Sequence, residues 1–307
     1  MLTDKNTLFM GVDGGGTKCR VRIESSSGDL LGVGLGGTAN PSQGLTTVAN
    51  SIVSATQMAL NEAGLAPNVM KNIVVGAGLA GLHLPQYHQL MMSWKHPFKT
   101  LFLTDDLQTA LLGAHQGNEG AVVIVGTGFS AMSLVKGEKT AIGGYGFLMA
   151  DYCSGSWIGH QAVQAILLDI DNLAPKTLLT SMLEDKFNGR GCQLVNQLVG
   201  ATPKEYGSIA PLVFLAAEKQ DLVANQIINQ SRQFISRVIE LLAKTNPARI
   251  SLVGGIAQRI QPSLSDDILN KLSQPLQSPE QGAIHFAKAQ YQAVNEASEK
   301  HFYLEED

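Results

Sequence analysis

The chain has 307 residues and a mass of 32.7 kDa, a length that predicts about two domains. Hydrophobic residues make up 44% and charged residues 16%, which excludes a mainly disordered chain. The net charge is −4 and no basic block recurs, so we expect no nucleic-acid partner. No stretch is apolar enough to span a membrane and no signal peptide is recognisable, so we expect a cytoplasmic protein. Three scattered cysteines fit a reducing compartment and argue against a zinc site.

The first part of the chain predicts a sheet with helices. An apolar run, three glycines and then alternating apolar and polar residues indicate a β-hairpin. Helical periodicity ending at Gly64 indicates a long helix. In chain order we expect strands at 8–12, 19–24 and 30–35, a helix at 46–63, a strand at 73–75, a helix at 85–94, a strand at 101–103 and a helix ending near 115.

The pattern then restarts about 110 residues further on, with a second strand, glycine turn and strand. Chance is one explanation, because hairpins with glycine are common, but an internal duplication is favoured. We therefore predict an α/β fold of two domains. The first spans 1–115 and is completed by a C-terminal helix at about 285–307, and the second spans 116–284 with helical insertions. The second half predicts strands at 121–125, 130–135 and 249–253 and helices at 156–169, 176–187, 208–219, 221–244 and 279–292.

The first glycine turn is the strongest chemical signal. Uncovered backbone N–H groups of Gly14, Gly15 and Gly16 can bind an anion, and Thr17 and Lys18 add a hydroxyl and a positive charge. Asp13 ends the preceding strand and is placed to hold Mg²⁺, through water. A Walker loop is excluded, because its spacing is absent and a strand follows. The alternative is a hairpin turn with no ligand.

Two further glycine segments add to this signal. Gly126, Thr127 and Gly128 offer a second anion site at the equivalent place in the second half. Gly254 and Gly255 follow a strand, where a nucleoside could lie against bare backbone. Each of the two segments alone could equally be an ordinary turn. We also count Gly282 among the glycines expected near the nucleotide.

A GxGxxG match at 32–37 is rejected as a dinucleotide motif, because Pro41 blocks an immediate helix and no acidic residue follows at the required distance. Asp105 is the candidate catalytic base, since it lies just beyond a strand end where open α/β sheets place ligands. The alternative is that its neighbour Asp106, and Asp105 with it, only begins the following helix, where carboxylates suit the N-terminus; we interpret Asp106 as the cap and Asp105 as the base. Cys153 is interpreted as a packed residue and not a nucleophile.

Together these features resemble the sugar kinase/Hsp70/actin superfamily, and within it the BadF/BadG-type branch that contains N-acetylglucosamine and glucosamine kinases. The resemblance covers roughly residues 8 to 290. It is carried by the first phosphate motif at 11–18, the second at 125–128 and the adenosine motif at 252–257. The branch is indicated by 38–41, 104–105 and 143–159. Two departures stand out: Tyr152-Cys153 replace the usual Glu-Gly, and Phe129 stands where Ser usually follows Gly128.

The resemblance implies two duplicated actin-like (ribonuclease H-like) ATPase domains with a central cleft. It implies ATP and Mg²⁺ as cofactors and transfer of phosphate to the 6-hydroxyl of an amino sugar. The sugar is expected to be N-acetylglucosamine, with glucosamine as the alternative, and a homodimer is expected. The implied sugar-binding residues are Asn40, Asp105, Gly144, Tyr145 and Asp151. An activator ATPase that bridges an iron–sulfur cluster, or a sugar-sensing regulator, would be other functions of the same fold.

Overall fold

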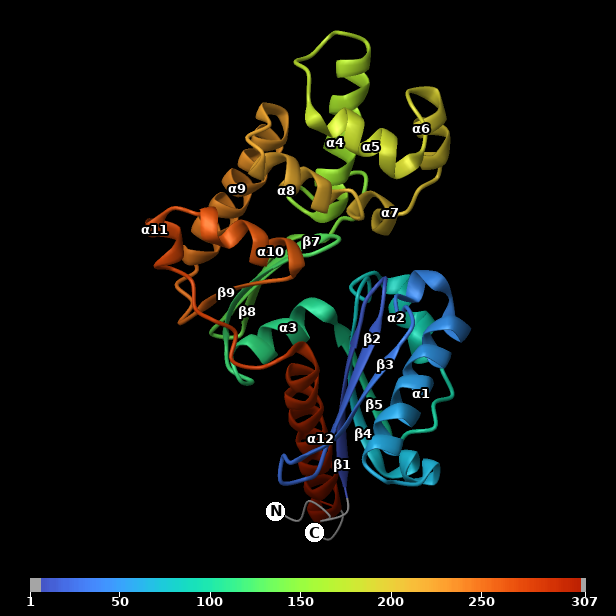
Figure 1. Cartoon of the computed structure of the whole chain (residues 1–307). Coiled ribbons are helices and arrows are strands. Elements are labelled where there is room, and N and C mark those ends of the chain that lie inside the picture. The colour runs from blue at the N-terminus through green and yellow to red at the C-terminus, as the bar shows by residue number, and fades with distance from the viewer. Residues whose placement is uncertain (1–6, 305–307) are drawn as a thin grey trace. The chain divides into compact units, whose positions relative to one another are not determined.

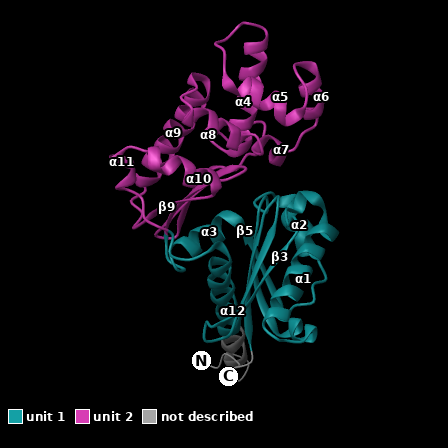
Figure 2. Cartoon of the chain, in the orientation of Figure 1, with its two compact units in different colours: residues 1–119, 275–307 teal, residues 120–274 magenta. Residues whose placement is uncertain are grey.

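The computed structural model describes residues 7–304. The chain forms two compact units, residues 1–119 with 275–307 (unit 1) and residues 120–274 (unit 2; Figure 2). The chain returns from unit 2 to unit 1 at residue 275, ten residues before the predicted boundary at 284/285. It does so because the whole last helix and the segment leading to it pack in unit 1. Within the described residues, no helix has the length and apolar character needed to cross a membrane.

Unit 1 is a five-stranded sheet in the order β3-β2-β1-β4-β5, with helices on both faces (Figure 1). The β1–β2 and β2–β3 pairs are antiparallel, while β4 and β5 run parallel to β1. The strands are β1 (Leu8–Gly14), β2 (Cys19–Glu24), β3 (Leu30–Gly36), β4 (Ile73–Leu79) and β5 (Thr100–Asp105). The α-helices are α1 (Leu45–Glu62), α2 (Pro85–Met92), α3 (Asp106–Ala114) and α12 (Pro279–Leu304), and short 3₁₀ turns lie at Pro41–Gln43 and Pro67–Asn72.

Glycines in β3 allow α1 to lie directly against the sheet. A Cβ atom added at Gly32, Gly34 or Gly36 would overlap a backbone carbonyl oxygen of α1. These residues are inside an edge strand, not in a turn that leads into a helix. The rejection of a dinucleotide motif is therefore confirmed, and close helix packing explains this part of the glycine excess.

The opposite face of the sheet is covered by α12 and α3 (Figure 1). A Cβ atom at Gly11 in β1 would overlap the carbonyl oxygen of Glu280, and one at Gly76 in β4 would overlap that of Ala283. Gly282 itself rests on the carbonyl oxygen of Thr109 in α3. The missing side chain of Gly282 therefore makes room for a neighbouring helix, and its expected place near the nucleotide stays a prediction.

Unit 2 repeats the first four strands of unit 1. Its sheet has the order β8-β7-β6-β9, with β6–β7 and β7–β8 antiparallel and β6–β9 parallel. Positions and directions match β3-β2-β1-β4, which supports the predicted duplication. The strands are β6 (Gly120–Val125), β7 (Phe129–Val135), β8 (Glu138–Gly143) and β9 (Ile250–Val253). The α-helices are α4 (Gly155–Ile170), α5 (Leu178–Phe187), α6 (Cys192–Leu198), α7 (Pro203–Gly207), α8 (Ala210–Glu218), α9 (Leu222–Ala243), α10 (Gly255–Ile260) and α11 (Asp266–Leu269).

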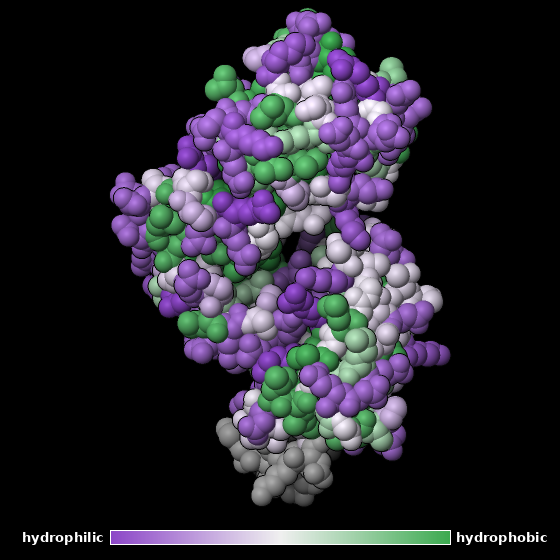
Figure 3. Space-filling model, in the orientation of Figure 1, coloured by the Kyte–Doolittle hydropathy of each residue, from purple (hydrophilic) through white to green (hydrophobic). Residues whose placement is uncertain are grey.

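Each unit has its own hydrophobic core. In unit 1 the larger cluster lies between the sheet and α1, and in unit 2 the core lies between the sheet and helices that include α4, α8 and α9. On the face shown in Figure 3, hydrophobic residues form separate small groups among polar ones in both units. The strand β8 and the helices α6, α7, α10 and α11 were not expected from the sequence.

Candidate active site

The glycine hairpin of unit 1 is open to solvent where its backbone N–H groups could bind an anion. Gly15 N–H donates to the carbonyl oxygen of Lys18 at 3.0 Å, which closes the turn between β1 and β2. Gly16, Thr17 and Lys18 are exposed, and within the described residues their N–H groups have no backbone partner. The predicted hairpin is confirmed, and its N–H groups without a backbone partner are where an anion could bind, so the phosphate-binding role stays a prediction.

Asp13 lies at the carboxyl end of β1, directly across the hairpin from Arg20. Burial raises its pKa to about 6, and the negative charge of Glu280 adds to this, while Arg20 and Lys18 act in the opposite direction. A bound cation would favour the ionised carboxylate. Within the described residues no group of three or more metal-ligating side chains occurs. A magnesium ion here would therefore depend on one or two carboxylates, water and phosphate oxygens, which is how Mg²⁺ is commonly held.

Asp105, and not Asp106 as predicted, caps the start of α3. Asp105 has an extended backbone and accepts the N–H of Gln108 at 2.7 Å, so Asp105 is the N-cap of α3. Asp106 is already in the first helical turn, and the prediction that it is the cap is wrong. Burial raises the pKa of Asp106 to about 7, and the charges of Asp105 and Asp13 contribute. Asp105 stays the predicted base. Its backbone is held as the last residue of β5.

Backbone hydrogen bonds bring the candidate residues of unit 1 together at one edge of the sheet. Asn40 caps a 3₁₀ turn, its Oδ1 accepting the N–H of Ser42 at 2.9 Å. The neighbouring Ala39 N–H donates to the carbonyl oxygen of Gly15 at 3.0 Å. Ala80 N–H donates to that of Gly14 at 2.8 Å, and β4 pairs with β5 up to Asp105. The glycine hairpin, Asn40 and Asp105 thus gather where the parallel strands end, as ligand sites do in such sheets.

The second glycine turn joins β6 to β7 and is fixed to the start of α4. Gly126 N–H donates to the carbonyl oxygen of Gly128 at 3.0 Å, so the turn is tight. The N–H groups of Gly155 and Ser156 donate to the carbonyl oxygens of Gly126 and Thr127, at 2.8 and 3.1 Å. This arrangement holds the backbone of the turn in one conformation.

Asp151 supports the same turn. It is buried, and its Oδ1 accepts the N–H of Phe129 at 3.3 Å. A Cβ atom at Gly128 would lie only 3.1 Å from Asp151 Oδ2. Burial raises the pKa of Asp151, partly offset by the Phe129 hydrogen bond. In this structure the Asp151 carboxylate therefore contacts the glycine turn between β6 and β7. The predicted contact with the sugar stays a prediction.

The other candidates of unit 2 lie around this turn. Gly144 N–H donates to the carbonyl oxygen of Phe129 at 3.1 Å, and Tyr145 is exposed. A Cβ atom at Gly254 would overlap the carbonyl oxygen of Val125, whereas Gly255 begins α10 with open space around it. Gly254 is therefore required by packing, and Gly255 is the position that leaves room for a ligand.

Phe129 and Tyr152, which depart from the family pattern, both lie against the side chain of Phe234. The sequence analysis did not single out Phe234. The ring of Phe234 in α9 lies 5.1 Å from the ring of Phe129 and 5.5 Å from that of Tyr152, measured between centroids. Trp157 is a further neighbour of Tyr152, at 6.3 Å. Contacts of this kind stabilise aromatic clusters. No sequence signal links α9 to the turn, because the pairing spans over a hundred residues.

The sequence profile of the BadF/BadG/BcrA/BcrD ATPase family matches residues 10–287. The chain belongs to this family. It is similar to glucosamine kinase GspK of Vibrio cholerae, with 34% identity over 91% of this chain and 95% of the relative. It is also 27% identical to an N-acetylmuramic acid/N-acetylglucosamine kinase of Clostridium acetobutylicum, over 82% of this chain and 86% of the relative.

Among solved structures, the chain is similar to one described as "Putative N-acetylglucosamine Kinase" from Chromobacterium violaceum. The TM-score is 0.87 with 30% identity, covering 92% of this chain and 99% of the other. The resemblance predicted from the three glycine motifs and the predicted α/β fold class are both confirmed by these comparisons. Membership of an ATPase family supports ATP as the nucleotide.

Proposed function

We propose that the chain transfers the γ-phosphoryl group of ATP to the 6-hydroxyl of an amino sugar. The observation that carries the proposal is the gathering of the glycine hairpin, Asn40 and Asp105 at one sheet edge of unit 1. The names of the relatives agree with it. The chain is an ATP-dependent carbohydrate kinase, as the motifs predicted.

In this proposal the attacking sugar oxygen forms a bond to the γ-phosphorus while the bond to the β–γ bridging oxygen breaks, and ADP leaves. Asp105 accepts the hydroxyl proton. Its Oδ1 is held by the N–H of Gln108, which fixes the carboxylate and leaves Oδ2 for the proton. The N–H groups of Gly16 and Thr17 in the first turn, and of Thr127 and Gly128 in the second, would bind the phosphates, since those of Gly15 and Gly126 close the turns themselves. Mg²⁺ near Asp13 would neutralise charge on the phosphate oxygens.

The substrate is N-acetylglucosamine or glucosamine. The Chromobacterium structure and the Clostridium relative support the acetylated sugar, and the Vibrio relative supports the free amine. An ADP-release assay on glucose, glucosamine, N-acetylglucosamine and N-acetylmannosamine would separate them. Equal, weak turnover on all four sugars would contradict an amino-sugar kinase.

The alternative of an activator ATPase is opposed by the cysteines. Cys19 and Cys153 are buried in the two cores, and of the three cysteines only Cys192 is exposed. Burial raises the pKa of Cys19 to about 12 and that of Cys153 well above its usual range. Thiols that stay protonated are poor ligands for an iron–sulfur cluster, which binds thiolates. Iron absorbance in the purified protein would reverse this conclusion.

The role of Asp105 can be tested against its neighbour. We expect Asp105→Asn to lower kcat by at least about 100-fold while ATP still binds, because a general base contributes about that much. Asp106→Asn is the matched control, since it removes an adjacent carboxylate of the same size. If Asp105→Asn keeps full turnover, or if only Asp106→Asn loses it, the assignment is wrong.

A further inference from the structure

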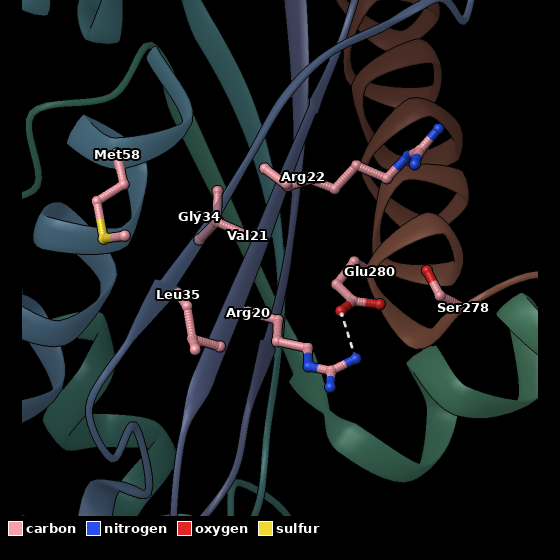
Figure 4. A pocket seen from close by; sticks show the side chains of 9 residues that line it. Arg20, Val21, Arg22, Gly34, Leu35, Met58, Ser278 and Glu280 are labelled. Carbon is pink, nitrogen blue, oxygen red and sulfur yellow. Dashed lines mark ion pairs between the residues drawn. The ribbon is translucent and has the colours of Figure 1, made fainter. Parts of the chain in front are cut away.

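A groove of about 460 Å³ lies in unit 1 between the β2–β3 ribbon and the start of α12 (Figure 4). Its wall carries Glu280, the second residue of α12, whose carboxylate points toward Arg20. Glu280 is only 7% exposed. One carboxylate oxygen lies 3.9 Å from the Arg20 guanidinium, while Oε2 is buried without a hydrogen-bond partner in the described part of the chain.

The position of Glu280 relative to Asp13 follows from the strand pairing. Gly11 and Asp13 are two residues apart in β1, so they face the same side of the sheet. The backbone of Glu280 lies directly over Gly11, where its carbonyl oxygen would overlap any Cβ atom. Arg20, which pairs with Asp13 across the hairpin, is also the ion-pair partner of Glu280. The Glu280 and Asp13 carboxylates therefore stand on one face of β1.

A buried carboxylate oxygen without a partner is costly in a folded protein and calls for a ligand. Arg20 compensates only in part, because it is half-exposed and its contact is long. The two carboxylates repel each other, and a divalent cation would relieve that repulsion. Mg²⁺ in phosphate-binding sites commonly takes one or two carboxylates and keeps several waters.

We propose that Glu280 is a second carboxylate of the magnesium site, its Oε2 holding a water molecule of the hydrated ion that Asp13 anchors. This inference rests on the proposed function. Both carboxylates belong to unit 1, so this unit supplies the protein side of the cation site. In this proposal Glu280 binds a water molecule of the hydrated metal ion, whereas Asp105 accepts the proton of the attacking hydroxyl.

The test is a titration of Mn²⁺ into the protein–ADP complex, followed by the electron paramagnetic resonance signal of free Mn²⁺. We expect Glu280→Gln to weaken Mn²⁺ binding by about 10-fold, the range seen when a group next to a metal is removed. Binding of ADP without metal should stay unchanged. If Glu280→Gln disturbs folding, Glu280→Asp keeps the charge and withdraws the carboxylate by one methylene, and it should weaken Mn²⁺ binding too.

Two matched controls separate the carboxylate from its surroundings. Arg20→Gln removes the ion pair but keeps Oε2, so Mn²⁺ should bind at least as tightly as in the unchanged protein. Glu24→Gln removes another buried carboxylate of the same face, paired with Arg22 at 2.7 Å, and should leave Mn²⁺ binding unchanged.

Equal Mn²⁺ affinity in the Glu280→Gln and unchanged proteins would overturn the role of Glu280 but not the proposed function. Weakening by Arg20→Gln as large as that by Glu280→Gln would also overturn it, because the ion pair and not the oxygen would then matter. If the unchanged protein bound neither ADP nor Mn²⁺ with ADP, the proposed function itself would fail, and this inference with it.

Discussion

Replacing Asp106 by Asn should stabilise the protein at neutral pH. Burial, helped by the charges of Asp105 and Asp13, raises the pKa of the Asp106 carboxyl from 3.8 to about 7. Between about pH 4 and pH 7 the folded protein therefore binds a proton that the unfolded chain has lost. The contribution of Asp106 to stability falls as the pH rises through this window. Asn carries no charge and does not incur that loss.

The size of the effect follows from the same values. A rise from 3.8 to about 7 is roughly three pH units, and each unit corresponds to about 1.4 kcal/mol, giving an upper limit of about 4 kcal/mol. Asp106 is half-buried, and water screens part of its charge. We therefore expect Asp106→Asn to gain about 2 kcal/mol in the free energy of unfolding at pH 8 and almost nothing at pH 4.

The measurement is urea unfolding of both proteins at several values between pH 4 and pH 8. The difference between the two proteins isolates Asp106 from other titrating groups. Asp266→Asn is the control, because Asp266 also lies in a first helical turn but is exposed, so its effect should stay within about 0.5 kcal/mol. A difference between Asp106→Asn and the unchanged protein that is constant across the pH range would refute the reasoning.

Two further predictions concern packing and capping. Gly34→Ala should lower the free energy of unfolding by about 2 kcal/mol, because its Cβ would overlap a carbonyl oxygen of α1; Gly37→Ala is the control for urea unfolding, since its Cβ would meet only the rotatable hydroxyl of Ser51 at 3.3 Å. Asp221→Ala should cost about 3 kcal/mol, because the carboxylate accepts N–H groups from two helix starts, Ala224 at 2.8 Å and Leu178 at 2.7 Å; an unchanged melting temperature would contradict this.

The sequence predicted the fold where local patterns were strong. Alternation at 19–24 and the glycine turn before it gave the β1–β2 hairpin, and a long apolar periodicity gave α1 and α9. The strand β8 was missed because its residues are mostly exposed and show no alternation, so only pairing with β7 defines it. Helix α10 was missed because it is short and follows glycine directly.

The candidate site was predictable in part. Motifs located the two glycine turns and Asp105, because these features are local in sequence. The start of α3 was misassigned by one residue, since two adjacent aspartates are both suited to a helix start and only the backbone angles distinguish them. Glu280 gave no signal, because its relation to Asp13 is created by a helix that packs on a strand far away in the chain.

The glycines of β3 have a consequence for how this protein can vary. Every replacement of Gly32, Gly34 or Gly36 adds at least a Cβ atom, and each such atom would overlap the backbone of α1, so these positions have no conservative substitution. Val33 and Leu35, which lie between them, face the other side of the strand and are exposed. We therefore expect tolerance to mutation to alternate residue by residue along β3: a deep mutational scan should find intolerant glycines separated by positions that accept many side chains.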